Sequence, residues 1–184
     1  MISTQIAAML GGAAAAVGDY QSIATTTVGV GGVASVTFSS FPSTYKHLQV
    51  RCIARGTAVA SYDYLRLRLN GATTGYSRHA LLGNGTAASA NASASDTLIG
   101  MGEIPASTST ANAFGVAVID LLDYANTTTN KTVRGLIGND QNGTGSVYLA
   151  SGALYSTSAI SSITLYPDTT LFAQYSTFAL YGIK

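Results

Sequence analysis

The sequence has few charged residues: Asp, Glu, Lys and Arg together make up 9% of its 184 residues, against about 25% in an average soluble domain. Its net charge is +1, so no overall field attracts the chain to nucleic acid or to anionic lipid. A freely diffusing domain usually keeps itself soluble with charged side chains. Thr, Ser, Asn, Gly and Ala take their place here, which indicates a surface suited to packing against other subunits.

Cysteine and long apolar runs are also scarce. Cys52 is the only cysteine, so an intrachain disulfide is excluded, and its place among apolar residues indicates a buried thiol. No run of residues approaches the roughly 18 apolar residues of a membrane-spanning helix. We therefore expect no membrane partner.

Residues that carry catalysis are few. The chain has two histidines, His47 and His79, and a single glutamate, Glu103. It has no zinc-ligand spacing, phosphate-binding loop, dinucleotide fingerprint or nucleophile elbow. We expect no catalytic residues, no metal and no cofactor, and a protein that is not an enzyme. The enzyme alternative is a small glycan hydrolase that would depend on Glu103.

The N-terminal segment 1–18, "MISTQIAAMLGGAAAAVG", is apolar and carries no charged side chain. It lacks the basic start of a signal peptide, because the first basic residue is Lys46. We interpret it as a docking arm held by a partner or by the body of the protein; the alternative is a short element packed on its own domain. The side chains expected to dock are Ile2, Ile6, Met9 and Leu10.

From residue 19 onward the chain reads as a series of short strands separated by turns. Residues 62–71 are the clearest case, because Leu65, Leu67 and Leu69 alternate with Arg66 and Arg68. The expected strands are 20–28, 33–38, 45–54, 62–71, 76–82, 97–104, 113–124, 131–139, 146–154, 161–167 and 171–184. No segment of this part shows a helical period. We predict one all-β domain over 19–184, a jelly-roll-like antiparallel sandwich of about 8–10 strands.

The order of these segments along the chain suggests how some of the strands pair. We expect 20–28 to form a hairpin with 33–38, and 62–71 to form one with 76–82. The low-complexity stretch 83–96 is expected to be a loop. The nearly continuous apolar run 113–124 is expected to be a buried strand.

Arginine and tyrosine offer a possible binding surface. Arg66 and Arg68 on one strand face resemble a nucleic-acid patch, which could extend to Arg51, Arg55 and Arg78 on neighbouring strands. A nearly neutral domain argues against that partner. Salt bridges from these arginines to Asp63 or Asp120 of a neighbouring subunit explain them better. Tyrosine suits such contacts because it combines a large ring with a hydrogen-bonding tip. The possible subunit interface consists of Arg66, Arg68, Tyr175 and Tyr181.

Four segments carry a family resemblance: "YQSIATTTV", "FSSFPSTYKHLQVRCIAR", "VIDLLDYANTTTNKTVRGLIG" and "FAQYSTFALYGIK". Together they resemble a β-sandwich module of tailed-bacteriophage virion proteins, over nearly all of residues 19–184. Similar modules occur in head decoration (cement) proteins and at the C-terminal ends of fibre or tail proteins. The resemblance implies a jelly roll that forms a homotrimer and has no enzymatic activity.

The short arm decides between these roles. A fibre protein would carry a long shaft before the module, whereas here about eighteen residues precede it. We therefore expect a capsid decoration protein on the outside of the head, with the major capsid protein or other virion proteins, and itself, as partners. The alternative is a tail, baseplate or fibre-tip protein that takes part in host attachment.

Overall fold

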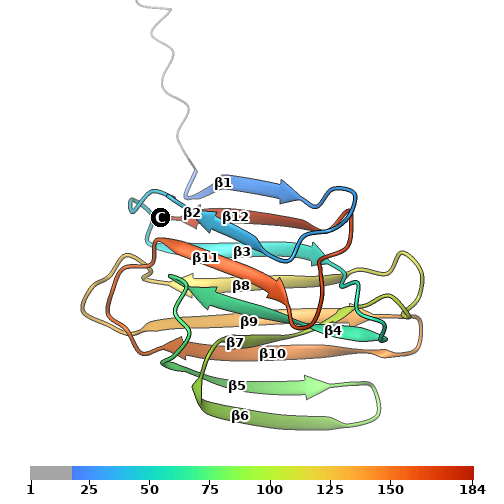
Figure 1. The fold of residues 1–184 in the computed structure, drawn as a ribbon. Coiled ribbons are helices and arrows are strands. Elements are labelled where there is room, and N and C mark those ends of the chain that lie inside the picture. The colour runs from blue at the N-terminus through green and yellow to red at the C-terminus, as the bar shows by residue number, and fades with distance from the viewer. Residues whose placement is uncertain (1–17) are drawn as a thin grey trace, which may run out of the picture.

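The computed structural model describes residues 18–184, which form a sandwich of two antiparallel β-sheets (Figure 1). The larger sheet has the strand order β1 (Tyr20–Thr27), β12 (Thr177–Ile183), β3 (His47–Ala54), β8 (Gly115–Leu122), β9 (Lys131–Asp140), β10 (Gly145–Leu154), β5 (Tyr76–Gly83) and β6 (Ala88–Asp96). The smaller sheet has the order β2 (Val36–Ser39), β11 (Ser162–Pro167), β4 (Tyr62–Leu69) and β7 (Ile99–Pro105). The predicted all-β sandwich is confirmed.

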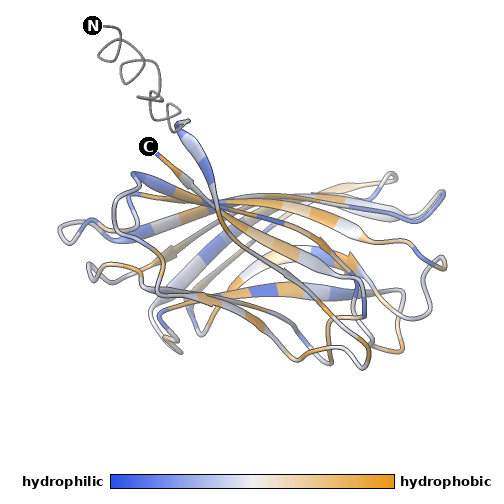
Figure 2. Cartoon of the chain, turned by 90° about the horizontal axis from the view of Figure 1, so that it is seen from above, coloured by the Kyte–Doolittle hydropathy of each residue, from blue (hydrophilic) through white to orange (hydrophobic). Residues whose placement is uncertain are grey.

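The core lies between the two sheets and is filled by alternate residues of each strand. Leu65, Leu67 and Leu69 of β4 are almost fully buried, as are Leu48 and Val50 of β3. Figure 2 shows the same interleaving of hydrophobic and hydrophilic residues along the strands. Burying one such side chain contributes about 1.5–3 kcal/mol. The predicted alternation of 62–71 is therefore correct, and β3 shows the same alternation.

Buried polar groups hold the loops to this core. The ammonium group of Lys131, at the start of β9, is buried and donates to the carbonyls of Asn126, Thr129 and Thr157, the last two at 3.0 and 3.5 Å. Burying a charge without such partners is costly. Lys131 therefore ties together the turn after β8 and the loop after β10.

Asp63 of β4 has a similar role at the other end of the sandwich. Its carboxylate is buried and accepts hydrogen bonds from the backbone N–H groups of Tyr64 (2.7 Å) and Asp168 (3.2 Å) and from the hydroxyl of Thr169 (3.0 Å). These donors belong to its own chain. Asp63 is therefore not exposed to an arginine of a neighbouring subunit, which leaves Asp120 of the two aspartates considered for such a bridge.

Both predicted hairpins between neighbouring segments are wrong. β1 pairs with β12, while β2 pairs with β11 in the other sheet. β4 pairs with β11 and β7, while β5 pairs with β10 and β6. An alternating strand can pair with any antiparallel neighbour that continues the sheet, so sequence order alone does not select its partner.

The stretch 83–96 is not a loop, because it forms the turn and the second strand of a hairpin with β5. β6 pairs with β5 along its length, and Asn84 organises the turn by accepting hydrogen bonds from the backbone N–H groups of Thr86 and Ala87 at 3.1 and 2.8 Å. The described part of the chain thus has twelve strands, more than the 8–10 expected. All but one residue of the expected docking arm, including Ile2, Ile6, Met9 and Leu10, lies outside the described residues.

Candidate interaction surface

The outer face of the larger sheet, on the side away from the core, carries a band of aliphatic side chains. We call this band the aliphatic stripe, and it consists of Ile53, Leu81, Val116, Val118, Leu136, Val147 and Leu149. Each of these side chains is between 40% and 58% exposed. They come from five neighbouring strands, β3, β8, β9, β10 and β5.

Strand register aligns the stripe into two rows across the sheet. In one row Val118, Leu136, Leu149 and Leu81 are successive partners on β8, β9, β10 and β5. The second row contains the partners Ile53 and Val116, and then Val147 two strands further on. Directly opposed residues in a sheet lie about 5 Å apart. The first row is therefore continuous, and the second is interrupted only at Gly138 of β9, between Val116 and Val147.

The area of the stripe is that of the largest apolar patch on a typical soluble protein. Two rows across about five strands, at roughly 4.8 Å per strand and 7 Å per row, cover an area of about 300–400 Å². Patches of this size on soluble proteins commonly mark an interaction site. Since its side chains are aliphatic and uncharged, the stripe is suited to contact an apolar protein surface.

A row of polar and charged side chains borders the stripe on one side. Asp120 of β8 accepts hydrogen bonds from the amide of Gln49 (2.7 Å) and from Nε of Arg134 (3.0 Å). Arg51 in turn donates from Nε to Gln49 at 2.8 Å and lies over the ring of Tyr181, 5.4 Å from its centre. These groups bond to one another across β3, β8 and β9. They therefore place charged and polar groups along this border of the stripe.

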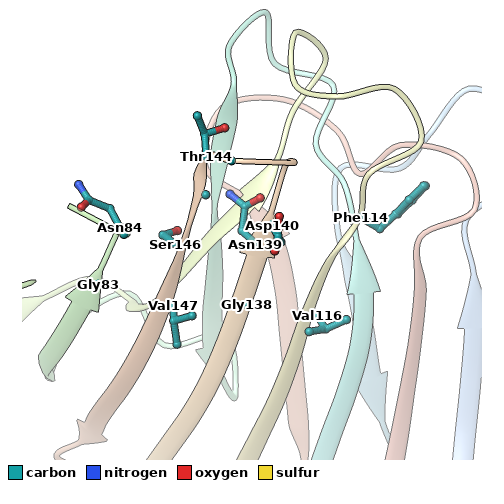
Figure 3. Close-up of a pocket in the computed structure, with 13 residues that line it drawn as sticks. Gly83, Asn84, Phe114, Val116, Gly138, Asn139, Asp140, Thr144, Ser146 and Val147 are labelled. Atoms are coloured by element: carbon teal, nitrogen blue, oxygen red, sulfur yellow. The ribbon is translucent and has the colours of Figure 1, made fainter. Parts of the chain in front are cut away.

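A depression lies at the end of the stripe, where β5, β8, β9 and β10 meet their loops (Figure 3). Its volume is about 510 Å³, and Val116 and Val147 of the stripe are among the residues that line it. Asn84 and Phe114 stand on opposite sides of it in this view. The outer face is thus recessed at this end of the stripe.

The four residues predicted for a subunit interface lie in different places. Arg66 and Arg68 project from the smaller sheet, where Arg66 pairs with Asp168 at 2.9 Å and Arg68 donates to the carbonyl of Thr97 at 3.1 Å. Tyr181 belongs to the larger sheet and stacks on the ring of Tyr20.

Tyr175 stands apart from the other three predicted residues. It precedes β12, has a φ of 73° and is 69% exposed, so strand alternation does not relate it to Tyr181. These four residues do not form one surface, and their role in assembly stays a prediction.

The arginines considered for a nucleic-acid patch also lie in different parts of the fold. Arg51 lies on the outer face of the larger sheet, whereas Arg55 holds a loop by donating to the carbonyls of Ala113 (2.7 Å) and Thr110 (2.9 Å). Burial lowers the pKa of the Arg55 side chain. Of the candidate arginines, Arg78 comes close to Arg66.

The candidate reactive groups are engaged in the fold. Glu103 accepts hydrogen bonds from the hydroxyls of Tyr148 and Ser146, both at 2.7 Å. Cys52 is buried as predicted, and burial raises the pKa of its thiol to about 12. His47 accepts a hydrogen bond from the backbone N–H of Asp123. Residues 18–184 contain no group of three or more His, Cys, Asp or Glu side chains arranged to hold a metal ion.

The aliphatic stripe was missed at the sequence level. The run 113–124 was expected to be a buried strand, but Val116 and Val118 face outward and half exposed. A strand that is aliphatic on both faces has the same sequence pattern whether its second face meets the core or another subunit. The useful signal is the repetition of such positions on consecutive strands, which requires knowledge of the register.

Comparison with known proteins identifies no relative: no protein-family model, no curated protein and no solved structure matches this chain. No helix long and apolar enough to cross a membrane occurs within the part of the chain described by the structure. The functional conclusion therefore depends on the geometry of the outer face and on the resemblance noted above.

Proposed function

We propose that this protein is a non-enzymatic structural protein of a bacteriophage virion, and within that class a capsid decoration protein. The observation that carries the proposal is the aliphatic stripe, a wide apolar surface left uncovered on a chain with few charges. The resemblance to virion β-sandwich modules supplies the context. The predicted partners are the major capsid protein, other virion proteins and further copies of this chain.

The size of the outer face supports a stable contact. Six strands at about 4.8 Å each, and four outward rows about 7 Å apart, give a face of roughly 800 Å². A standard protein–protein interface covers about 800 Å² on each partner. The outer face from β3 to β6 thus has about the area of a standard interface.

In this proposal the stripe lies against the head lattice. Contacts of a single subunit add up when several subunits are joined, because the second contact then occurs at a high effective concentration. A homotrimer, which the resemblance implies, would gain in this way. Decoration would stabilise the shell by burying area across the joints between capsid subunits.

The first test is the position of the protein in the particle. An antibody to this protein, imaged on purified virions, is expected to label the whole head. Label confined to the tail or its tip would exclude decoration and support the alternative, a tail, baseplate or fibre-tip protein involved in host attachment.

The second test addresses the stripe itself. Leu136→Lys with Leu149→Lys places two charges side by side in its centre. Each leucine is about half exposed, so burial of its remaining apolar surface in a contact would contribute about 1 kcal/mol of binding free energy per residue. The variant is expected to bind heads that lack the protein at least roughly 30-fold more weakly than the wild type.

The control for this variant is Thr37→Lys. Thr37 is exposed on β2, a strand of the smaller sheet, so the added charge lies away from the stripe. Binding to heads should be unchanged, as measured by sedimentation of labelled protein with the heads. Normal binding by the stripe variant, with an unchanged melting temperature, would exclude the stripe as the lattice contact.

A further inference from the structure

The two sheets differ in width, and this difference creates a step. β7 is the last strand of the smaller sheet and packs on β9 and β10 of the larger one. The larger sheet continues past it through β5, which β7 contacts only in part, and β6, which lies beyond the smaller sheet (Figure 1). A pocket of about 240 Å³ lies in the step, lined by residues of β4, β7, β5, β6 and β10.

A β-bulge opens this pocket on the β7 side. The register between β4 and β7 shifts at Arg66, whose partner is Gly100, while Leu65 is opposite Gly102. Gly102 has a φ of 147°, a backbone conformation that residues other than glycine rarely adopt. Bulges of this kind redirect side chains and occur often beside binding sites.

Two guanidinium groups converge on Gly100. A methyl group at this position would lie 2.7 Å from Nη1 of Arg66 and 3.5 Å from Nε of Arg78. Each arginine is oriented by one carboxylate: Nε of Arg66 donates to Asp168 at 2.9 Å and Nε of Arg78 to Asp96 at 3.3 Å. The Nη groups of Arg66 therefore remain available for a further acceptor in the pocket.

The other walls supply neutral hydrogen-bonding groups. Tyr64 and Tyr148 line the pocket, as does Asn91, whose Oδ1 accepts a hydrogen bond from Arg78 at 2.7 Å. Burial raises the pKa of Tyr64 to about 12. The pKa of Tyr148 is raised as well, mainly by burial and then by its hydrogen bond to Glu103. Both phenols are therefore protonated at neutral pH. The single proton of Tyr148 is donated to Glu103, so Tyr148 offers a ligand its oxygen as an acceptor.

We propose that this pocket, with Arg66 and Arg78 as its anion-binding pair, binds a sugar that carries a carboxylate, of the hexuronate class. Arginine suits a planar carboxylate because its guanidinium offers paired parallel donors. Tyrosine hydroxyls and the Asn91 amide suit ring hydroxyls. The volume is below the roughly 300–1,000 Å³ of sites for drug-sized ligands and corresponds to a single sugar ring.

This proposal does not depend on the virion role, since the pocket and the stripe lie on opposite sides of the larger sheet. Arg66 and Arg78 each already have a carboxylate partner, and Glu103 lies close to Tyr148. A bound anion shares the arginines with these groups, so its net gain is small. We expect a dissociation constant in the range of about 1 mM.

The test is an NMR titration of the full chain, labelled with ¹⁵N, with glucuronate at constant ionic strength. Saturable shifts are expected for the backbone amides of Gly100, Arg78 and Tyr148. Glucose, which lacks the carboxylate, and acetate, which lacks the ring, should each bind at least five-fold more weakly. Absence of saturable shifts with glucuronate would overturn the proposal, and equal binding of acetate would overturn the assignment to a sugar.

Three variants locate the site. Gly100→Ala places a methyl group against Arg66, and Arg78→Gln removes one charge; each should weaken glucuronate binding at least ten-fold. Arg134→Gln is the matched control, because it removes an arginine that is paired with Asp120 on the outer face. Equal weakening by the control would show non-specific charge attraction and refute the site. The dispersion of each spectrum reports folding, and Gly100→Ala retains both charges.

Discussion

The packing of the two sheets predicts a sharp contrast between two glycines on neighbouring strands. Gly152 of β10 faces the core, and a methyl group there would lie 2.5 Å from Cγ2 of Ile99 on β7 and 2.9 Å from its Cδ1. Ile99 is fully buried and has no room to move. Gly138 of β9 faces outward, and a methyl group there would meet Val116 at an ordinary 3.6 Å.

Gly152→Ala should therefore destabilise the protein by overpacking. Insertion of a methyl group into a well-packed core typically costs about 1–3 kcal/mol. In a domain of this size each kcal/mol lowers the melting temperature by roughly 2–4 °C, so we expect a decrease of about 2–12 °C. Gly138→Ala should raise stability by up to about 1 kcal/mol, because alanine restricts the unfolded chain.

The assay is thermal unfolding of both variants in the same buffer, followed by calorimetry and circular dichroism. A double variant, Gly152→Ala with Ile99→Ala, isolates the contact, since removal of Ile99 leaves space for the new methyl group. The coupling energy should be about 0.5–3 kcal/mol. Equal melting temperatures for Gly152→Ala and Gly138→Ala, or strict additivity in the double variant, would refute the described packing of β10 on β7.

Two further predictions concern buried groups. Lys131→Met should lower the free energy of unfolding by about 2–4 kcal/mol in urea titrations at pH 7, because three carbonyls lose their donor; a change below about 0.5 kcal/mol would contradict the loop-tying role. The Cys52 thiol should react with a thiol reagent at pH 8 only after unfolding, since burial raises its pKa to about 12. The neutral thiol is the form that the folded state favours. The stability contributed by the buried, neutral Cys52 thiol is therefore complete below the pKa that this thiol has in the unfolded chain, and is lost as the pH rises towards 12. Rapid reaction of Cys52 in the folded protein would contradict burial.

Alternation within single strands could be predicted from the sequence because it depends on nearest neighbours. Leu65, Leu67 and Leu69 had to face one way once the strand formed, and they face the core between the two sheets. The same holds for Leu48 and Val50 of β3. The sandwich follows from several such strands with no helix between them.

Strand pairing could not be predicted, because it joins residues far apart in the chain. Tyr20 is opposite Ile183, and nothing in the sequence near either residue specifies the other. β6 was missed for another reason: its Ala, Ser and Asn residues have low strand propensity. It forms because β5 offers a full row of backbone partners and Asn84 closes the turn.

The candidate sites were hidden from the sequence for the same reason. The stripe needs the register of five strands, and the pocket needs Arg66 from one sheet and Arg78 from the other to converge on one glycine. Arg66 was predicted to be a functional residue, but as part of an interface with Arg68. Its neighbour in space is Arg78, which the sequence places twelve residues away on a strand of the other sheet.

The pairing of β1 with β12 determines how the domain bears mechanical load. Tyr20 pairs with Ile183, and the N–H of Lys184 donates to the carbonyl of Asp19 at 2.9 Å, so the two ends of the described chain meet at one corner (Figure 2). Tension applied between these ends would open the β1–β12 ladder one residue pair at a time. Tension between the corner and the opposite edge, β6, would instead pull across all the strands of the larger sheet. A subunit tethered at its corner is therefore weakest when both ends are pulled apart.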